Sequence, residues 1–164
     1  MTAIPRQIVL SMLGSDFDNN YISLPWVGSS RRILIAWRSW LGSVSVSRVD
    51  TFSTSLQFNS FNIGSWWLTC VYEPQDNQAK IQFFQELRDV RAQCTGSWMV
   101  AGDFNLIYRD EDKNNSNLNR AMMGRFRKGI DDMAVSEIRR KFTWSISSDS
   151  ASPTLVKLDR VLCL

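Results

Sequence analysis

Two apolar, strand-like segments separated by one amphipathic helix pattern constrain the fold of this chain most strongly. The first segment is Ser65–Tyr72, the helix pattern runs over Asn77–Cys94, and the second segment is Trp98–Gly102. A strand, a helix and a second strand in this order return the second strand parallel to the first. The carboxyl ends of both strands then lie at one edge of the sheet, so the residues that follow them are expected to meet there.

Short β-rich patterns precede this unit. β-branched and aromatic residues between turn residues predict successive antiparallel strands over Arg32–Trp37, Val44–Val49 and Thr54–Asn59, after an amphipathic segment over Arg6–Leu13. The C-terminal part predicts two β segments around a Ser-rich turn that contains Pro153. Strands before and between helices indicate a mixed α/β class, and we expect residues 1–164 to form a single domain.

The two predicted helices each carry one apolar stripe. Residues spaced three and four apart form the stripe of the first helix, namely Ile81, Phe84, Leu87, Val90 and Cys94. The stripe of the second helix consists of Met123, Phe126, Ile130 and Met133. Both stripes are interpreted as core, because apolar residues at this spacing face the interior far more often than a ligand.

Composition excludes several classes of function. The chain contains no histidine, which excludes His-based acid–base catalysis and the Ser-His-Asp and Cys-His nucleophile systems. Its three cysteines, Cys70, Cys94 and Cys163, have no disulfide or zinc spacing, so we expect an intracellular protein of the nucleus or cytoplasm that is not secreted. No apolar run is long enough to span a membrane. The net charge of +3 permits an anionic partner without requiring nucleic acid.

An acid and an amide follow the second strand of the central unit. Gly102 lets the backbone turn, and Asp103 and Asn105 then stand on one side while Phe104 points away. A carboxylate at such a place can orient an attacking water or hold a divalent metal, and an amide can donate to a charged oxygen. The alternative is an ordinary turn at the end of a strand, because Asp and Asn are common turn residues.

Two further polar residues favour the functional interpretation. Tyr72 ends the preceding parallel strand and is expected near Asp103, and Asp159 stands inside an apolar run, where a charge needs a partner. The ordered segments "LGSDFD", "GSWWLTCVYEPQ", "WMVAGDFNLI", "EDKNN", "MMGRFR", "FTWS" and "PTLVKLDRVLC" cover nearly the whole chain. Together they resemble the endonuclease/exonuclease/phosphatase superfamily, and more closely the endonuclease domain of LINE-type (non-LTR) retrotransposons of plants.

The resemblance implies a four-layer α/β sandwich, the DNase I-like fold, that hydrolyses phosphodiester bonds of DNA with Mg²⁺ or Mn²⁺. It implies that Asp103 activates the attacking water near the metal and that Asn105 stabilises the transition state. It also implies that Tyr72 contacts the scissile phosphate and that Asp159 orients a catalytic histidine. Asp103 and Asn105 would form an incomplete Mg²⁺ site.

The chain departs from the family pattern at both ends. The metal-binding Asn and Glu segments of the family would precede Met1, and its Ser-Asp-His segment would follow Leu164, so we expect an incomplete sandwich with open sheet edges that favour self-association. Glu73 replaces a small residue of the family, and its charge is expected to repel phosphate near Tyr72.

Three hypotheses of function follow. The first is a fragment of a retroelement endonuclease whose hydrolysis of DNA is lost or very weak, because the family's histidine and metal-binding Glu are absent. The second is a non-catalytic domain that binds nucleic acid or protein with the same fold. An active phosphatase of the superfamily ranks last, since it needs the same histidine.

Other charged and aromatic groups receive structural interpretations. Arg125–Gly129 and Arg139–Lys141 are interpreted as a solvated helix face and a loop, and the acidic segment Arg109–Lys113 as solvated loop charge. Tryptophans inside strand patterns are usually core, so Trp66, Trp67 and Trp98 are assigned to the interior and not to stacking on bases.

Overall fold

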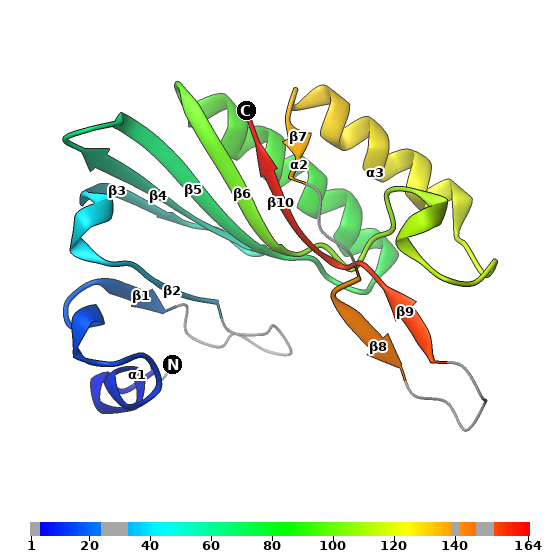
Figure 1. Ribbon diagram of the computed structural model, residues 1–164. Coiled ribbons are helices and arrows are strands. Elements are labelled where there is room, and N and C mark those ends of the chain that lie inside the picture. The colour runs from blue at the N-terminus through cyan, green and yellow to red at the C-terminus, as the bar shows by residue number, and fades with distance from the viewer. Residues whose placement is uncertain (1–3, 24–32, 139–141, 147–152) are drawn as a thin grey trace.

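A mixed β-sheet forms the middle of the molecule (Figure 1). The computed structural model describes residues 4–23, 33–138, 142–146 and 153–164, and within them six strands pair in the order β3-β4-β5-β6-β10-β7. Their bounds are Ser43–Val49 for β3, Ser53–Ser60 for β4, Gly64–Tyr72 for β5, Ser97–Asp103 for β6, Ser136–Glu137 for β7 and Asp159–Cys163 for β10. Strands β5 and β6 are parallel, and the other neighbours are antiparallel. The predicted parallel crossover is confirmed.

Two helices cover one face of this sheet (Figure 1). Helix α2 spans Asn77–Gln93 and begins where the Asp76 side chain accepts hydrogen bonds from the amides of residues 78 and 79. Helix α3 spans Arg120–Asp132, and the Asn119 side chain caps it in the same way. Their apolar faces and the sheet side chains beneath them form the larger core, which includes Phe83, Phe104, Phe126, Trp98 and Leu162.

The stripe predicted for α2 is confirmed at Phe84, Leu87, Val90 and Cys94 and is wrong at Ile81. Ile81 is 56% exposed, whereas Phe83 is fully buried and Lys80 is 8% exposed. The sequence contains two overlapping series with helical spacing, and Phe83 fixes the phase because its ring packs against Phe104 with centroids 6.1 Å apart. The stripe predicted for α3 is confirmed at all four positions.

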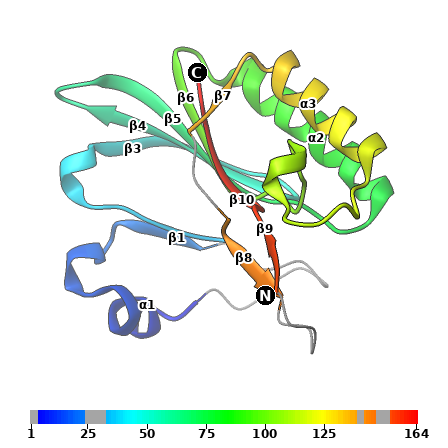
Figure 2. The same cartoon turned by 45° about the vertical axis from the view of Figure 1, so that its right-hand side comes forward.

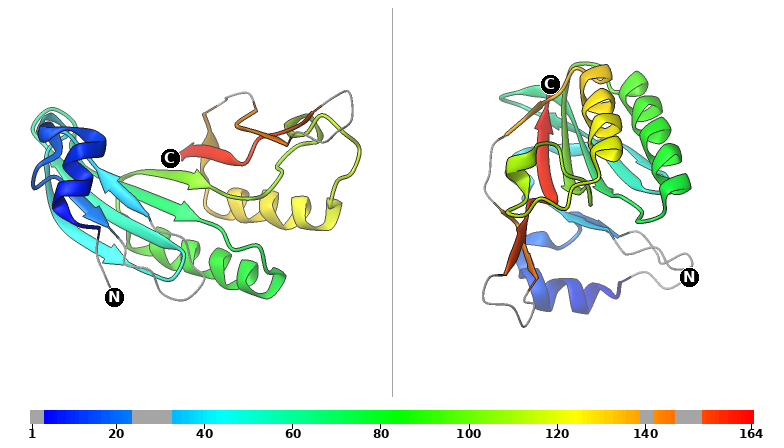
Figure 3. Two further views of the ribbon diagram at one scale, coloured as in Figure 1. Left: turned by 90° about the horizontal axis from the view of Figure 1, so that it is seen from below. Right: turned by 90° about the vertical axis from the view of Figure 1, so that its right-hand side faces the viewer.

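A second, smaller layer covers part of the opposite face. Strands β1 (Tyr21–Ser23) and β2 (Leu34–Ala36) form an antiparallel pair, and helix α1 (Arg6–Leu13) lies outside them (Figure 3). The smaller core joins β2 to β4 through Ile35, Trp37, Leu56 and Phe58. Helices, main sheet, small sheet and α1 thus give four layers, of which the second sheet is short. The predicted α/β sandwich is confirmed.

The C-terminal part forms a hairpin and then enters the main sheet. Strands β8 (Trp144–Ile146) and β9 (Thr154–Val156) pair beside the start of β10 (Figure 2), and Pro153 directly precedes β9. Two β segments were predicted here, but the second divides into β9 and β10. The Ser-rich turn at 147–152 lies outside the described residues. Short 3-10 helices occur at Ser15–Phe17 (η1), Ser39–Leu41 (η2) and Asp110–Asp112 (η3).

Candidate active site

Three predicted site residues lie on neighbouring strands at one end of the main sheet. Tyr72, the last residue of β5, is the strand partner of Asp103, the last residue of β6. Asp103 is in turn the partner of Asp159, the first residue of β10. Direct partners across strands share a face of the sheet and have Cβ atoms about 5 Å apart. The strand register therefore brings the hydroxyl and the two carboxylates together.

The face on which they lie follows from the strand alternation. Val71, Val100 and Leu162 belong to the core under the helices. Tyr72, Asp103 and Asp159 have the opposite parity in their strands, so they face away from α2 and α3. This is the face that β1 and β2 cover only in part.

Asn105 joins this corner through its backbone and its amide. Its N–H donates to Asp103 Oδ1 at 2.8 Å, and its Nδ2 donates to the carbonyl oxygen of Glu73 at 3.0 Å. The backbone of Asn105 has φ of 44°, a left-handed conformation that Asn tolerates better than most residues. Phe104 is fully buried on the helix side, as predicted. The strand end thus directs Asp103 and Asn105 to one place.

The exposure of Asp159 differs from the expectation. It was expected to be a charge inside an apolar strand, but it is the first residue of β10 and is exposed. The buried charge of this segment is Arg160, whose side chain is 1% exposed. Side chains alternate between the two faces along β10, so Arg160 faces the helices and is buried, whereas Asp159 faces the opposite side and is exposed.

Glu73 does not present its carboxylate to the site. Its side chain is fully buried, and Lys80 Nζ lies 3.2 Å from Oε2. Burial raises the pKa of Glu73, Lys80 lowers it and the nearby charge of Asp103 raises it, and together these effects bring the pKa to about 8. The expectation that Glu73 repels phosphate near Tyr72 is therefore wrong, because its carboxyl group is fully buried and faces Lys80.

The donor set can be compared with the ligands that a divalent cation requires. Within the described residues, no three acidic or cysteine side chains converge as a metal cage. Mg²⁺, however, is commonly held by one or two carboxylates together with water and substrate phosphates. Asp103 and the Asn105 amide oxygen are ligands of this kind, and water and the substrate phosphate would complete the site.

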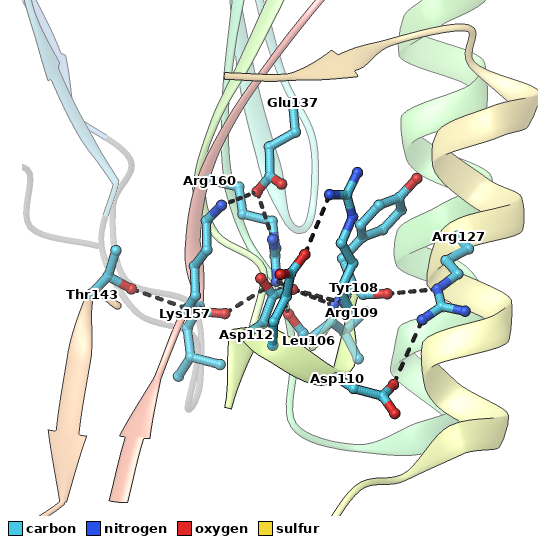
Figure 4. A network of polar contacts seen from close by, with 12 residues as sticks. Leu106, Tyr108, Arg109, Asp110, Asp112, Arg127, Glu137, Thr143, Lys157 and Arg160 are labelled. Carbon is cyan, nitrogen blue, oxygen red and sulfur yellow. Dashed lines mark hydrogen bonds and ion pairs between the residues drawn. The ribbon is translucent and has the colours of Figure 1, made fainter. Parts of the chain in front are cut away.

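A network of buried charges was missed from the sequence (Figure 4). Arg160 contacts both Asp112 and Glu137, and Glu137 also contacts Lys157. Asp112 was interpreted as solvated loop charge, but it is only 7% exposed, unlike its neighbour Glu111. The signal available in the sequence was a pair of cations, Lys157 and Arg160, inside an apolar segment, where each needs an acid.

The remaining predictions concern groups outside this corner. Trp98 and Trp67 are buried and Trp66 stacks on Phe58, so the core assignment is confirmed. The charged residues of Arg125–Gly129 lie on the solvent face of α3, as predicted, whereas 139–141 lie outside the described residues. A cavity of about 350 Å³ lies between α3, β7 and β10, and Tyr72, Asp103, Asn105 and Asp159 do not line it.

Comparisons with known proteins rest on structure. The sequence matches no protein-family model and no curated protein. The structure is similar to the 3′ phosphatase NExo from Neisseria, solved with a product DNA hairpin, at 14% identity and a TM-score of 0.65, over 98% of this chain and 70% of that one. It is also similar to TDP2 from Caenorhabditis elegans, at 15% identity and a TM-score of 0.56, over 98% of this chain and 52% of that one.

A third similar structure is the endonuclease domain of TRAS1, a telomere-specific non-LTR retrotransposon. The identity is 10% and the TM-score 0.54, over 68% of this chain and 50% of that one. The chain thus spans about half the length of the TRAS1 domain and of TDP2. None of the helices in the described part of the chain is long and apolar enough to cross a bilayer. The likeness to these three proteins shows that the chain has the DNase I-like α/β sandwich fold.

Proposed function

We propose that this chain is a nuclease-type domain of retroelement origin whose remaining site residues bind a phosphodiester of DNA. The observation that carries the proposal is the convergence of Tyr72, Asp103, Asn105 and Asp159 at one end of the sheet. Likeness to the TRAS1 endonuclease domain and the ordered sequence segments support a retroelement origin. The Neisseria protein solved with a DNA product supports DNA as the ligand.

Each residue has a distinct role in this proposal. The Asp103 carboxylate orients a water toward the phosphorus, and the Asn105 amide donates to a phosphate oxygen. The Tyr72 hydroxyl contacts the same phosphate from the neighbouring strand. A bound Mg²⁺ or Mn²⁺ would supply charge neutralisation of the phosphate at Asp103 and Asn105.

We infer further that hydrolysis by this chain is absent or very weak. The proposed role of Asp159 is to orient a histidine, and the chain contains none. Removing members of a cooperating set of catalytic residues commonly lowers the rate by several orders of magnitude. Phosphate binding depends on the residues that remain and is expected to persist.

The test measures binding and cleavage in one preparation. Fluorescence anisotropy with a short DNA duplex at low salt should show binding that weakens as salt rises, because phosphate contacts release counterions. Asn105→Ala should weaken binding by about tenfold or more, the loss of one hydrogen bond to a charged group. The control is Asn62→Ala, since Asn62 lies in the turn at the far end of β5 and should leave affinity unchanged.

Cleavage is measured on supercoiled plasmid with Mg²⁺ or Mn²⁺. We expect no nicking above an Asp103→Ala control. Robust nicking that Asp103→Ala abolishes would show an active nuclease and refute the inferred loss of hydrolysis. Equal affinities of wild type and Asn105→Ala for DNA would remove the proposed phosphate site and leave the alternative, a non-catalytic domain that binds its partner elsewhere.

A further inference from the structure

Arg160 is a buried cation whose contacts join four separate parts of the chain. Its Nη1 donates to Glu137 Oε1 at 2.6 Å, and its Nη2 donates to Asp112 Oδ2 at 2.8 Å. The same Nη2 donates to the carbonyl oxygens of Leu106 at 3.0 Å and Lys157 at 3.1 Å. The planar guanidinium also lies over the Phe126 ring, 5.4 Å from its centroid. Figure 4 shows Arg160 among these partners.

Residues 158–160 hold the loop that contains Asn105 on both sides. Before Asn105, the Phe104 amide donates to the carbonyl oxygen of Leu158 at 3.0 Å. After it, the Leu106 carbonyl accepts from Arg160. Asn105 lies between the two contacts in a left-handed conformation. Such a conformation persists where the surrounding structure enforces it, and here both enforcing contacts come from residues 158–160.

The far end of the same loop is fixed by the same network. Asp112 Oδ2 accepts from the amides of Tyr108 and Arg109 at 3.0 and 2.8 Å in addition to Arg160. Lys157 Nζ lies 2.8 Å from Glu137 Oε1, so two cations and two acids balance in the interior. The guanidinium is therefore held from several directions, and a displacement that released Leu106 would also leave the buried Asp112 without its cation.

We propose that Arg160 is a positioning residue that holds Asn105 in place for phosphate binding, an inference that rests on the function proposed above. Arg160 does not reach the phosphate itself, because it lies on the helix side of the sheet. It acts through the Leu106 carbonyl and the β9–β10 segment. The competing explanation is that Arg160 only stabilises the fold. In that case, the effect of replacing Arg160 on DNA binding does not depend on Asn105.

The test is a double-variant cycle with Arg160→Lys and Asn105→Ala. A lysine keeps the charge, but it cannot form the fork to Asp112, Glu137 and Leu106 at once. If Arg160 acts through Asn105, Arg160→Lys should weaken DNA binding about threefold to fivefold in the wild-type background and not at all in the Asn105→Ala background. Equal losses in the two backgrounds would indicate a structural role and overturn the proposal.

A second measurement does not depend on DNA. Hydrogen exchange of the Asn105 amide, which donates to Asp103 Oδ1, should accelerate about tenfold in Arg160→Lys, because the loop opens locally. Exchange of the β4 amides, in the sheet interior, should stay unchanged. The control is Arg88→Lys, because Arg88 forms an exposed pair with Asp132, 3.5 Å away, and should alter neither signal.

The readouts separate the two proposals. If Asn105→Ala leaves the affinity for DNA unchanged while Arg160→Lys accelerates exchange of the Asn105 amide, the proposed phosphate site is refuted. The role of Arg160 in positioning the loop is then retained. Unchanged exchange in a folded Arg160→Lys protein would refute the positioning itself. If Arg160→Lys does not fold, Glu137→Gln loosens the same guanidinium while keeping an acceptor for it, and the same cycle and exchange outcomes apply.

Discussion

Glu73 illustrates how a single buried acid borders the candidate site without taking part in it. Its N–H donates to the Asp103 carbonyl at 2.9 Å and its carbonyl accepts from Asn105, so its backbone supports both site residues. Its side chain turns into the interior toward Lys80. The backbone therefore belongs to the site corner and the carboxyl group to the core.

The raised pKa of Glu73 predicts a pH dependence of stability. Its pKa is about 8 in the folded protein and 4.5 ordinarily, so the folded state retains a proton that the unfolded state loses. The contribution to stability is therefore complete below pH 4.5 and is lost as the pH rises to about 8. Urea unfolding should show wild type losing about 4 kcal/mol more than Glu73→Gln between pH 5 and pH 8.5. Parallel pH profiles of the two proteins would contradict this.

The positions of single site residues were predictable where they depend on secondary-structure elements that are close in the sequence. Tyr72, Asp103 and Asn105 follow from two strand ends and the parallel crossover, all within 34 positions of the sequence. The partners of Arg160 were not predictable, because Asp112 and Glu137 lie 48 and 23 positions away and no periodicity links them. Buried ion pairs between distant segments depend on the finished packing, which a sequence pattern does not contain.

At the level of elements, the pairing of β5 with β6 depends on Gly102. Its φ is 144°, and a Cβ at this position would lie 2.0 Å from the carbonyl oxygen of Val71. The sequence suggested that Gly102 allows a turn, but it lies inside β6, one residue before its end. It is required because the neighbouring backbone approaches too closely for any side chain.

Two glycine variants test this requirement as a matched pair. Gly102→Ala should lower the free energy of unfolding by about 3 kcal/mol or more, because the backbone of β5 must move away from β6. Gly124→Ala should raise it by about 0.5–1 kcal/mol, because alanine favours the helix and nothing lies within 4 Å of the added atom. Thermal unfolding of both variants gives the comparison. A Gly102→Ala protein as stable as wild type would show that the strands tolerate a side chain there.

Most elements were predictable because each carries its own periodicity. The strands from β2 to β6 and helices α1, α2 and α3 all lie at or near their predicted positions. The stripe of α2 was wrong only at Ile81, because the buried face of the helix includes Phe83, whose ring packs against Phe104. The break between β9 and β10 was missed because no Gly or Pro interrupts the run from Thr154 to Cys163. In the structure, the hydrogen bonds of Leu158 and Asp159 to Thr143 end one pairing and begin another.

At the scale of the whole molecule, the edge strands of the main sheet are irregular or short, but several large apolar side chains are exposed to solvent. Edge strand β3 contains a register shift between Val44 and Val46, and edge strand β7 spans two residues, so neither offers a long flat edge. At one end of the sheet, however, Trp40 is 72%, Ile63 71% and Phe61 104% exposed. The predicted self-association is expected to involve this apolar tip, formed by Trp40, Phe61 and Ile63.

Removing the apolar tip should therefore change association and leave the fold intact. Phe61→Ser with Ile63→Ser should shift sedimentation toward the monomer, while the melting temperature changes by about 2 °C or less, because surface positions contribute little to stability. Ile81→Ser, an equally apolar exposed position on α2, serves as the control. Unchanged sedimentation of the double variant would place association elsewhere.

The position of β10 has a consequence for synthesis on the ribosome. This strand is made after β7, yet it lies between β6 and β7 in the finished sheet. Until β10 is synthesised, the edge of β6 that pairs with β10 has no partner strand, and neither has β7. The position between them must stay unoccupied in the nascent chain. We expect translation pauses before residue 159, or chaperones that bind at that stage, to influence whether β6 pairs with β10 or with a strand of another chain.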